Sequence, residues 1–477
     1  MSDEVNNGLP PKTRWAIVWF VLLGAAVLIW QGEFRNWFAK NDEDDSGSLN
    51  SPGPLPSSPA PVPLTSLQET DGGIGETVSK KRQAPRTPHQ PIEDPKDVAM
   101  CSFYSALNSL DNKKDKKLVR VAHYGDSILT TDELSGRIRR ILQKRFGDGG
   151  HGFVLLGKPW RWYHHLDVNH GARGKWRARP LTSDPISDGL YGLGGVAFET
   201  RHRNAVAWAG TVEEGPIGTR VASFDISYLQ QPRGGRFDLI VSGKVVETVD
   251  TSSKTRQVEH KILNISPGKA KLTVKTHGDG PIRLFGATLE SDSPGIVYDS
   301  LAINGARASI LARFDETHWK SELSRRDIDL IVIMFGANEG HNESLVLDEY
   351  RVHLAALLTT IREGAPEAGC LIIGPLDQAR RKKDGRLGSR RMPAKLSQAQ
   401  REVALEHKCA FFDTFTAMGG KKSMARWYRS GLGGGDLVHP TEHGARRIGS
   451  WLADAILAGY ESFLYGGKQC VSNVTTL

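Results

Sequence analysis

The hydrophobic periodicity changes twice along this 477-residue chain, and these changes constrain its fold more than any other feature. Apolar runs typical of buried strands alternate with helical patterns up to about residue 150 and again after about residue 295. Between them, short segments of alternating apolar and polar residues are separated by glycine turns, which is typical of an all-β sandwich. The sequence therefore predicts an α/β domain with a parallel sheet and helices on both faces, formed by 98–150 and 296–477, and a β-sandwich inserted at 151–295.

The first 97 residues show a different pattern. Residues 15–31 hold no charged residue and no proline, and at ~1.5 Å per residue the apolar run is roughly 24 Å long. No small-residue cleavage site follows it, so we expect an uncleaved transmembrane signal anchor after a cytoplasmic N-terminus at 1–14. Residues 32–97 are acidic at first and then rich in proline and serine, which predicts a disordered linker. Together they predict a single-pass membrane protein whose folded part is extracytoplasmic.

Charge and cysteine usage narrow the classes of partner. The net charge of +8 and the pI near 9.2 favour acidic partners, either an anionic glycan or a membrane surface. No nucleic-acid recognition motif is present. The four cysteines lie far apart without CxxC spacing, so neither a zinc ribbon nor a dense disulfide framework is expected, and Cys370 and Cys409 are interpreted as buried core residues. No histidine and aspartate run has metal-ligand spacing, so we expect no metal and no cofactor.

Four polar motifs stand out in the α/β part: three follow apolar strand-like segments, and the fourth stands just before the last predicted helix. They are Gly125-Asp126-Ser127, Asn304-Gly305, Gly336-Ala337-Asn338 and Asp436-Leu437-Val438-His439. Because the carboxyl ends of parallel strands meet at one edge of a sheet, we expect these motifs to lie together.

These residue types are the ones that acyl transfer requires. Ser127 is the candidate nucleophile, His439 the base that takes its proton, and Asp436 the carboxylate that orients the histidine. A tetrahedral oxyanion needs donors aimed at it. The backbone N–H groups of Ser127 and Gly305 and the side-chain amide of Asn338 are the candidate donors.

In this order, "GDS", "ING", "GAN" and "DLVH" resemble the motif pattern of the SGNH (GDSL-type) hydrolase family, over about 115–150 and 295–465. The resemblance implies a flavodoxin-like hydrolase domain and serine-based ester cleavage through an acyl-enzyme. The inserted sandwich is similar to the arrangement in bacterial cell-envelope members, which include peptidoglycan and exopolysaccharide O-acetylesterases and acetyltransferases. This similarity implies removal of O-acetyl groups from an acetylated, anionic polysaccharide. With the predicted anchor, it also implies a single-pass protein of the bacterial inner membrane whose catalytic domain is periplasmic or extracytoplasmic. Transfer of the acetyl group to a glycan hydroxyl by the same triad, and an inactive glycan-binding scaffold, remain as alternatives.

Two further segments are candidate glycan contacts. Trp160, Trp162 and Tyr163 form either a stacking platform for sugar rings or part of the sandwich core. Arg380 and Arg381 lie in the basic segment 378–391, which is either a contact for an anionic polymer or a solvated loop.

Several neighbours of the motifs have simpler interpretations. Glu339 is expected to be a solvated loop carboxylate, and His443 a surface residue of the last helix. His123 and Tyr124 are expected to be packing residues. A helix is predicted over 130–146, with Thr130, Thr131 and Asp132 as its capping residues.

Overall fold

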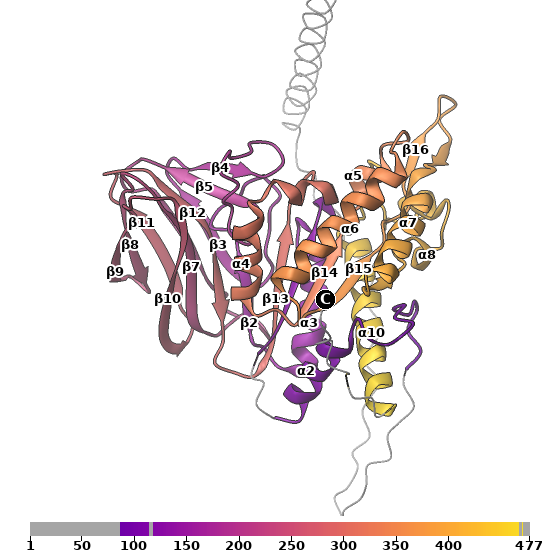
Figure 1. Ribbon diagram of the computed structural model, residues 1–477, viewed down its shortest axis with the longest axis horizontal. Helices are drawn as coiled ribbons and strands as arrows, with labels where there is room; N and C mark the ends of the chain where they lie inside the picture. Colours follow the sequence, from indigo (N-terminus) through magenta and orange to yellow (C-terminus); the bar gives the residue numbers. More distant parts are fainter. Residues whose placement is uncertain (1–85, 114–117, 467–469, 471–477) are drawn as a thin grey trace, which may run out of the picture. The chain divides into compact units, whose positions relative to one another are not determined.

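The computed structural model describes residues 86–113, 118–466 and 470, all of which belong to one compact unit (Figure 1). The predicted anchor at 15–31 and most of the predicted linker lie outside these residues. Among the residues described, no helix has the length and apolar character needed to cross a membrane.

The α/β part is built on a five-stranded sheet in which every neighbouring pair is parallel. Its order is β13 (Gly295–Ala302), β1 (Leu118–Gly125), β14 (Leu330–Met334), β15 (Gly369–Ile373) and β18 (Ala410–Phe412). All five residues of β14 are buried, as expected for a central strand covered on both faces.

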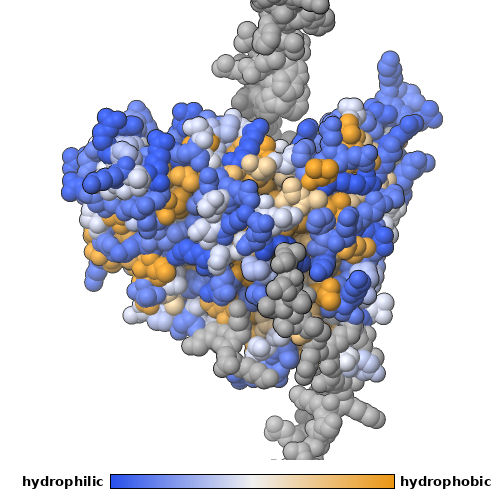
Figure 2. Space-filling view, viewed as in Figure 1, coloured by the Kyte–Doolittle hydropathy of each residue, from blue (hydrophilic) through white to orange (hydrophobic). Residues whose placement is uncertain are grey.

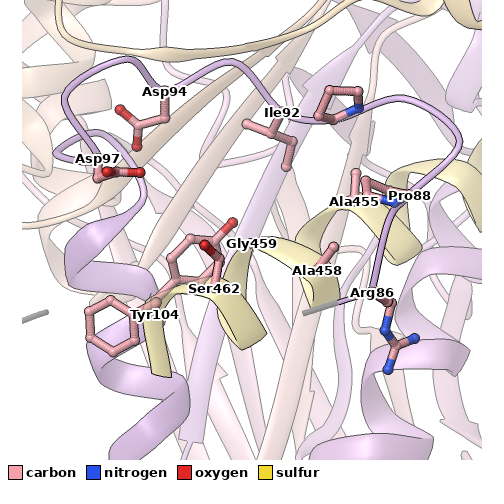
Figure 3. A pocket seen from close by; sticks show the side chains of 12 residues that line it. Arg86, Pro88, Ile92, Asp94, Asp97, Tyr104, Ala455, Ala458, Gly459 and Ser462 are labelled. Atoms are coloured by element: carbon pink, nitrogen blue, oxygen red, sulfur yellow. The ribbon is translucent and has the colours of Figure 1, made fainter. Parts of the chain in front are cut away.

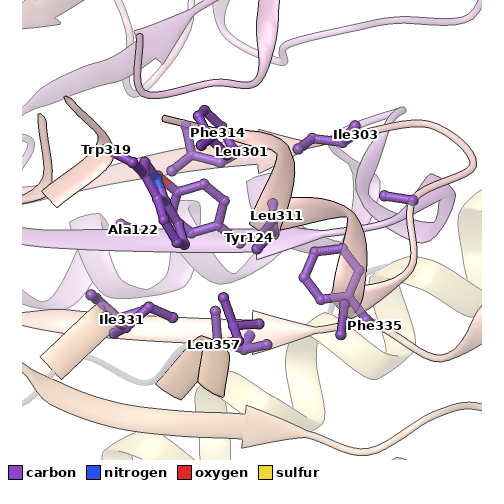
Figure 4. Close-up of a cluster of buried hydrophobic side chains, with 14 of the residues drawn as sticks. Ala122, Tyr124, Leu301, Ile303, Leu311, Phe314, Trp319, Ile331, Phe335 and Leu357 are labelled. Carbon is purple, nitrogen blue, oxygen red and sulfur yellow. The ribbon is translucent and has the colours of Figure 1, made fainter. Parts of the chain in front are cut away.

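Helices cover both faces of this sheet (Figure 1). Leu330 and Val332 of β14 point into the core shared with α2 (Cys101–Asp111), α3 (Glu133–Phe146) and α10 (Glu442–Tyr465). Ile331 and Ile333 point into the core shared with α4 (Glu316–Arg326), α6 (Leu347–Gly364) and α7 (Met392–Glu406). Figure 4 shows part of this second core around Tyr124. Each fully buried aliphatic side chain contributes about 1.5–3 kcal/mol.

The inserted segment forms two antiparallel sheets packed through one core. The first consists of β10 (Gln257–Gly268), β7 (Val221–Gln230), β12 (Ile282–Glu290), β5 (Val196–Thr200) and β4 (Arg177–Pro180), with β2 (Gly150–Val154) beside β12. The second consists of β3 (Val168–Arg173), β6 (Val206–Thr211), β11 (Lys271–Thr276), β8 (Arg236–Val241) and β9 (Lys244–Asp250). Phe224 and Phe237 are among the side chains that fill the space between them.

Buried charges join the insert to the sheet domain. Asp299 of β13 is fully buried and accepts a hydrogen bond from the backbone N–H of Phe153 at 2.8 Å. Arg326 donates to Asp299 at 2.7 Å and to Glu290 of β12 at 2.5 Å. Removing one partner from such a buried network costs about 3–5 kcal/mol, so the insert is held firmly against the sheet.

Residues 86–97, expected in the linker, lie on the sheet domain. Glu93 pairs with Phe411 through two backbone hydrogen bonds of 2.8 and 2.9 Å, and the ring of His89 stacks on Trp451 at 4.3 Å. Figure 3 shows the pocket that this segment forms with α2 and α10, with Arg86 at one end.

The interpretation of the cysteines is wrong in one respect. Cys370 and Cys409 are buried, but they form a disulfide with Cα atoms 4.7 Å apart, and Cys101 pairs with Cys470. Cys370 lies in β15 and Cys409 immediately precedes β18. Because these strands are neighbours in the sheet, their pairing depends on the strand order, which spacing along the chain does not show.

The basic segment 378–391 is not an irregular loop. It contains a hairpin of β16 (Ala379–Arg381) and β17 (Leu387–Ser389), which projects beside the carboxyl edge of the sheet and is hydrophilic in Figure 2. Short helices complete the domain: η1 (Ser127–Leu129), η2 (Ala308–Arg313), α5 (Ala337–Gly340), α8 (Thr414–Ala417) and α9 (Ser423–Arg429).

Candidate active site

Ser127 lies on a tight turn directly after β1. A Cβ atom on Gly125 would lie 2.5 Å from Leu129 and 2.8 Å from the carbonyl oxygen of Met334, so only glycine fits between β1 and η1. Asp126 is extended, and its carboxylate accepts the N–H of Ile128 at 3.0 Å. These contacts place Ser127 at the first residue of η1, just beyond the carboxyl end of the strand.

The predicted caps of the following helix are only partly confirmed: Asp132 occupies the N-cap position, whereas Thr130 and Thr131 lie before it. The helix α3 begins at Glu133, and Asp132 precedes it with φ of 56° and no side-chain capping bond. Its carboxylate instead binds the buried guanidinium of Arg139 at 2.8 Å. Thr130 donates its hydroxyl to the carbonyl oxygen of Ser127 at 2.8 Å and thereby stabilises the serine turn.

Asp126 joins the serine turn to the Asn338 loop. It is buried, and its second carboxylate oxygen accepts the N–H groups of Gly336 and Ala337 at 3.2 and 3.0 Å. Burial raises the pKa of Asp126 above its usual range, although these N–H groups lower it. No sequence pattern predicts this positioning role of Asp126, because it depends on where the Asn338 loop lies in the fold.

Ser127, His439 and Asp436 form one hydrogen-bonded chain. The Ser127 Oγ to His439 Nε2 distance is 2.6 Å, and the His439 Nδ1 to Asp436 Oδ2 distance is also 2.6 Å. An ionised carboxylate only accepts, so Nδ1 carries the proton and Nε2 is left to accept from the serine hydroxyl. Leu437 has φ of 63°, and this left-handed residue lets the loop fold Asp436 back onto His439.

The charges of this pair are mutually stabilising. Partial burial raises the pKa of Asp436, but hydrogen bonds from His439 and from the N–H of Val438 outweigh it and lower the pKa to about 2. Burial lowers the pKa of His439, whereas the hydrogen bond and charge of Asp436 raise it above its usual value. The pair therefore favours an imidazolium, the state formed when the histidine takes the serine proton.

Three donors remain available around Ser127. Within the described part of the chain, neither the N–H of Ser127 nor that of Gly305 has an acceptor. Asn338 donates one amide hydrogen to the carbonyl oxygen of Ala306 at 2.7 Å, and its second amide hydrogen is left for a ligand. Gly305 has φ of 73°, and nothing lies within 4 Å of where a Cβ would be, so this backbone faces open space.

The predicted glycan contacts separate into two groups. Trp160 and Tyr163 are buried in the core between the insert and the sheet. They are therefore core residues, although not of the core between the two sheets of the sandwich. Trp162 is 52% exposed. The N–H of His164 donates to the carbonyl oxygen of Thr130 at 3.2 Å, which places this segment next to the serine turn.

Arg380 and Arg381 are exposed on β16. The N–H of Ala379 donates to the carbonyl oxygen of Leu437 at 2.9 Å, so their hairpin adjoins the loop that carries Asp436 and His439. His443 is exposed on α10.

The expectation for Glu339 is wrong. Its side chain is buried, with 1% exposure, and accepts the N–H of Ala308 at 2.8 Å. Burial raises its pKa to about 7. Its place in a polar motif indicated solvent exposure, whereas the loop after Gly305 folds over it. His123 and Tyr124 are buried as expected, with a hydrogen bond between Tyr298 and His123 of 2.9 Å.

Comparison with known proteins agrees with this geometry. Residues 270–447 match the model of the GDSL-like Lipase/Acylhydrolase family, a span that includes Gly305, Asn338, Asp436 and His439. The chain carries a GDSL-type hydrolase domain. Ser127 precedes the matched span, and the hydrogen bond to His439 assigns it to the same hydrolase site.

The solved structures extend the likeness to the insert. A peptidoglycan O-acetylesterase shares 23% identity over 79% of this chain and 99% of its own, with a TM-score of 0.65, which shows the same fold. Two family two carbohydrate esterases also match. That of Clostridium thermocellum shares 11% identity over 59% of this chain and 98% of its own, with a TM-score of 0.24. That of Cellvibrio japonicus shares 11% identity over 62% and 99%, with a TM-score of 0.26. A search of curated proteins finds no match.

Proposed function

We propose that this hydrolase is a serine esterase that removes O-acetyl groups from a cell-envelope polysaccharide. The observation that carries the proposal is the chain of two 2.6 Å contacts from Ser127 through His439 to Asp436. A serine hydroxyl becomes a nucleophile only when a positioned base takes its proton, and here the base is itself oriented by a carboxylate.

The reaction follows from these positions. Ser127 Oγ attacks the acetyl carbonyl carbon while His439 Nε2 takes the hydroxyl proton, and the carbonyl oxygen becomes an oxyanion that the N–H groups of Ser127 and Gly305 and the Asn338 amide stabilise. Collapse breaks the bond to the sugar oxygen, which receives the proton from His439. Water then attacks the acetyl-serine by the same route, releases acetate and restores the hydroxyl.

Three observations support an envelope polysaccharide as substrate. A solved structure with the same fold is that of a peptidoglycan O-acetylesterase. The site is bordered by the exposed Trp162, which offers an aromatic face, and by the exposed Arg380 and Arg381, which offer positive charge. These three side chains are the proposed glycan contacts.

The two disulfides support an extracytoplasmic location. Cys101–Cys470 and Cys370–Cys409 are both paired, and disulfides persist in oxidising compartments. We therefore propose that the hydrolase domain faces the periplasm or exterior, held by the apolar segment 15–31 as a membrane anchor.

Hydrolysis is favoured over acetyl transfer by the openness of the site. The side chains of His439 and Asp436 are 39% and 52% exposed, so water reaches the base that would activate it. Transfer requires a second sugar hydroxyl to displace this water.

Acetate release by the full chain from O-acetylated peptidoglycan and from a small acetyl ester tests the proposal. Ser127→Ala and His439→Ala are expected to abolish release from both substrates. His443→Ala, which removes an exposed histidine four residues away, is the matched control and is expected to retain it. Equal activity of wild type and Ser127→Ala would refute the esterase. Acetylated glycan products in place of acetate would indicate transfer.

A further inference from the structure

The glycine of the oxyanion site lies in a β-turn of defined type. The N–H of Ala306 donates to the carbonyl oxygen of Ile303 at 3.1 Å. Gly305, at the third position of this turn, has φ of 73°, and Asn304 is not among the residues with positive φ. This combination is a type II turn. The N–H of Ile303 donates to the carbonyl oxygen of Gly125 at 2.9 Å, which fixes the turn beside the serine loop.

The orientation of one peptide unit distinguishes a type II turn from a type I turn. The two types differ at ψ of the second residue and φ of the third, a rotation of the peptide between them. Here that peptide consists of the carbonyl of Asn304 and the N–H of Gly305. In a trans peptide these two groups point to opposite sides. A contact that holds the Asn304 oxygen therefore also sets the direction of the Gly305 N–H.

A side chain of the inserted β domain makes that contact. Thr182 donates its hydroxyl to the carbonyl oxygen of Asn304 at 3.0 Å. Its neighbour Leu181 is fully buried and donates its N–H to the carbonyl oxygen of Gly195 at 3.0 Å. Arg313 donates to the carbonyl oxygen of Leu181 at 3.2 Å. Thr182 thus follows a residue that is held through both its N–H and its carbonyl group.

The other side-chain hydrogen bonds to this loop are made to residues that follow the Asn304–Gly305 peptide. Asn338 binds the carbonyl of Ala306, and Glu339 binds the N–H of Ala308. Within the described residues, Thr182 supplies the one side-chain hydrogen bond to the Asn304–Gly305 peptide. Gly305 has no side chain, and no atom lies within 4 Å of its Cβ position, so packing around that position does not hinder rotation.

We propose that Thr182 of the inserted domain is a positioning residue for the oxyanion site. Its hydroxyl holds the Asn304 carbonyl on the insert side, so that the Gly305 N–H points away from the insert and toward the reacting carbonyl. Without it, a rotated peptide would present the Asn304 oxygen, a negative dipole end, to the developing oxyanion. This inference rests on the proposed esterase function, because it assigns Gly305 to the oxyanion.

Thr182→Val tests the inference, because valine keeps the shape and removes the hydroxyl. We expect kcat for a small acetyl ester to fall about three- to tenfold, as the loss of one hydrogen bond shifts the peptide orientation and weakens an oxyanion donor. KM is expected to stay within about twofold, since the donor acts mainly in the transition state. Thr182→Ser, which retains the hydroxyl, is expected to recover most of kcat.

Thr248→Val is the matched control, because Thr248 also lies in the insert and donates its hydroxyl, to Asp238 at 2.7 Å. It is expected to leave kcat unchanged. Wild-type kcat in Thr182→Val, an equal loss in Thr182→Ser, or a loss confined to KM would each overturn the inference.

A crystal structure of Thr182→Val separates this inference from the proposed function. If the wild type hydrolyses no acetyl ester, the esterase proposal fails. The orientation of the Asn304 carbonyl in the variant still shows whether the Thr182 hydroxyl sets the orientation of this peptide. A rotated peptide in the variant supports the positioning role. An Asn304–Gly305 peptide that keeps its present orientation overturns it.

Discussion

The buried carboxyl group of Glu339 makes the stability of this hydrolase depend on pH in an unusual direction. One carboxylate oxygen accepts the N–H of Ala308, and the other is buried without a hydrogen-bond partner in the described part of the chain. Burial raises the pKa of Glu339, the Ala308 N–H lowers it, and the charge of Asp126 raises it further, so that it moves from 4.5 to about 7.

The sign of the effect follows from proton binding. The unfolded chain releases the Glu339 proton near pH 4.5, whereas the folded protein keeps it up to about pH 7. Between these values the folded state binds more protons, so its stability falls as the pH rises. The pKa of Glu339 is about 2.5 higher in the folded protein than in the unfolded chain, which corresponds to about 3.4 kcal/mol of unfolding free energy. This stabilisation is lost by pH 8.

Glu339→Gln is expected to prevent this fall in unfolding free energy at high pH. The glutamine oxygen still accepts from Ala308 but the side chain does not ionise, so we expect the variant to match the wild type near pH 5 and to exceed its stability at pH 8 by about 2–3 kcal/mol. At ~2.1 cal/mol/K per residue, a unit of roughly 380 residues has an unfolding entropy of about 0.8 kcal/mol/K, so the shift in Tm is about 2.5–4 °C.

Thermal unfolding at pH 5 and pH 8 measures this shift. Glu367→Gln, which changes an exposed glutamate, is the matched control and should leave both Tm values unchanged. A Glu339→Gln protein that follows the wild-type pH dependence, or is less stable at pH 8, would refute the reasoning.

Three further predictions concern the site and its surroundings. Because Asp436 raises the pKa of His439, kcat/KM should rise with pH, with a midpoint above the usual ~6.5 of histidine. Asp436→Asn should lower kcat at least about 100-fold and move this midpoint to lower pH. A pH–rate profile of both proteins measures the two effects. Trp162→Ala should raise KM for O-acetylated peptidoglycan several-fold and leave the small ester unaffected, as paired kinetics would show. Replacing both Cys370 and Cys409 by alanine should cost about 2–4 kcal/mol of unfolding free energy in denaturant titrations, because the bond closes a loop across a sequence separation of 39.

The parts of the fold that depend on local patterns could be predicted from the sequence. Buried strands, helical spacing and the change to alternating residues are properties of contiguous segments, and they indicated the parallel sheet and the sandwich. Three of the four motifs were also predictable as a group, because they follow β1, β13 and β14 and parallel strands end at one edge. The Asp436–His439 motif follows α9 instead, and the motif pattern of the family indicated its place in the site. The order of the four motifs along the chain matched the motif pattern of the family, and this match predicted that Ser127, Asp436 and His439 lie together.

What could not be predicted depends on which segments meet. Glu339 sits in a polar motif, and its burial arises only because the loop at Ala308 folds over it. The Cys370–Cys409 pair needs the strand order of the sheet. The contact between Thr182 and Asn304 joins residues in two different domains, and no periodicity in either segment indicates it.

The sandwich contacts the candidate active site although it joins the chain at the opposite edge of the parallel sheet. The insert leaves after α3 and returns at β13, where Ile296 donates its N–H to the carbonyl of Gly147 at 2.9 Å, so the two junctions lie together and the pairing of β13 with β1 is undisturbed. These junctions lie at the amino end of β13, where Gly295 pairs with Leu118, whereas Ser127 and Gly305 follow the carboxyl ends of β1 and β13. The insert therefore reaches the site through its own loops. Its segments at Thr182 and His164 contact the glycine turn and the serine turn. Exchanging the insert for an unrelated sandwich should therefore lower kcat even toward an ester too small to touch it.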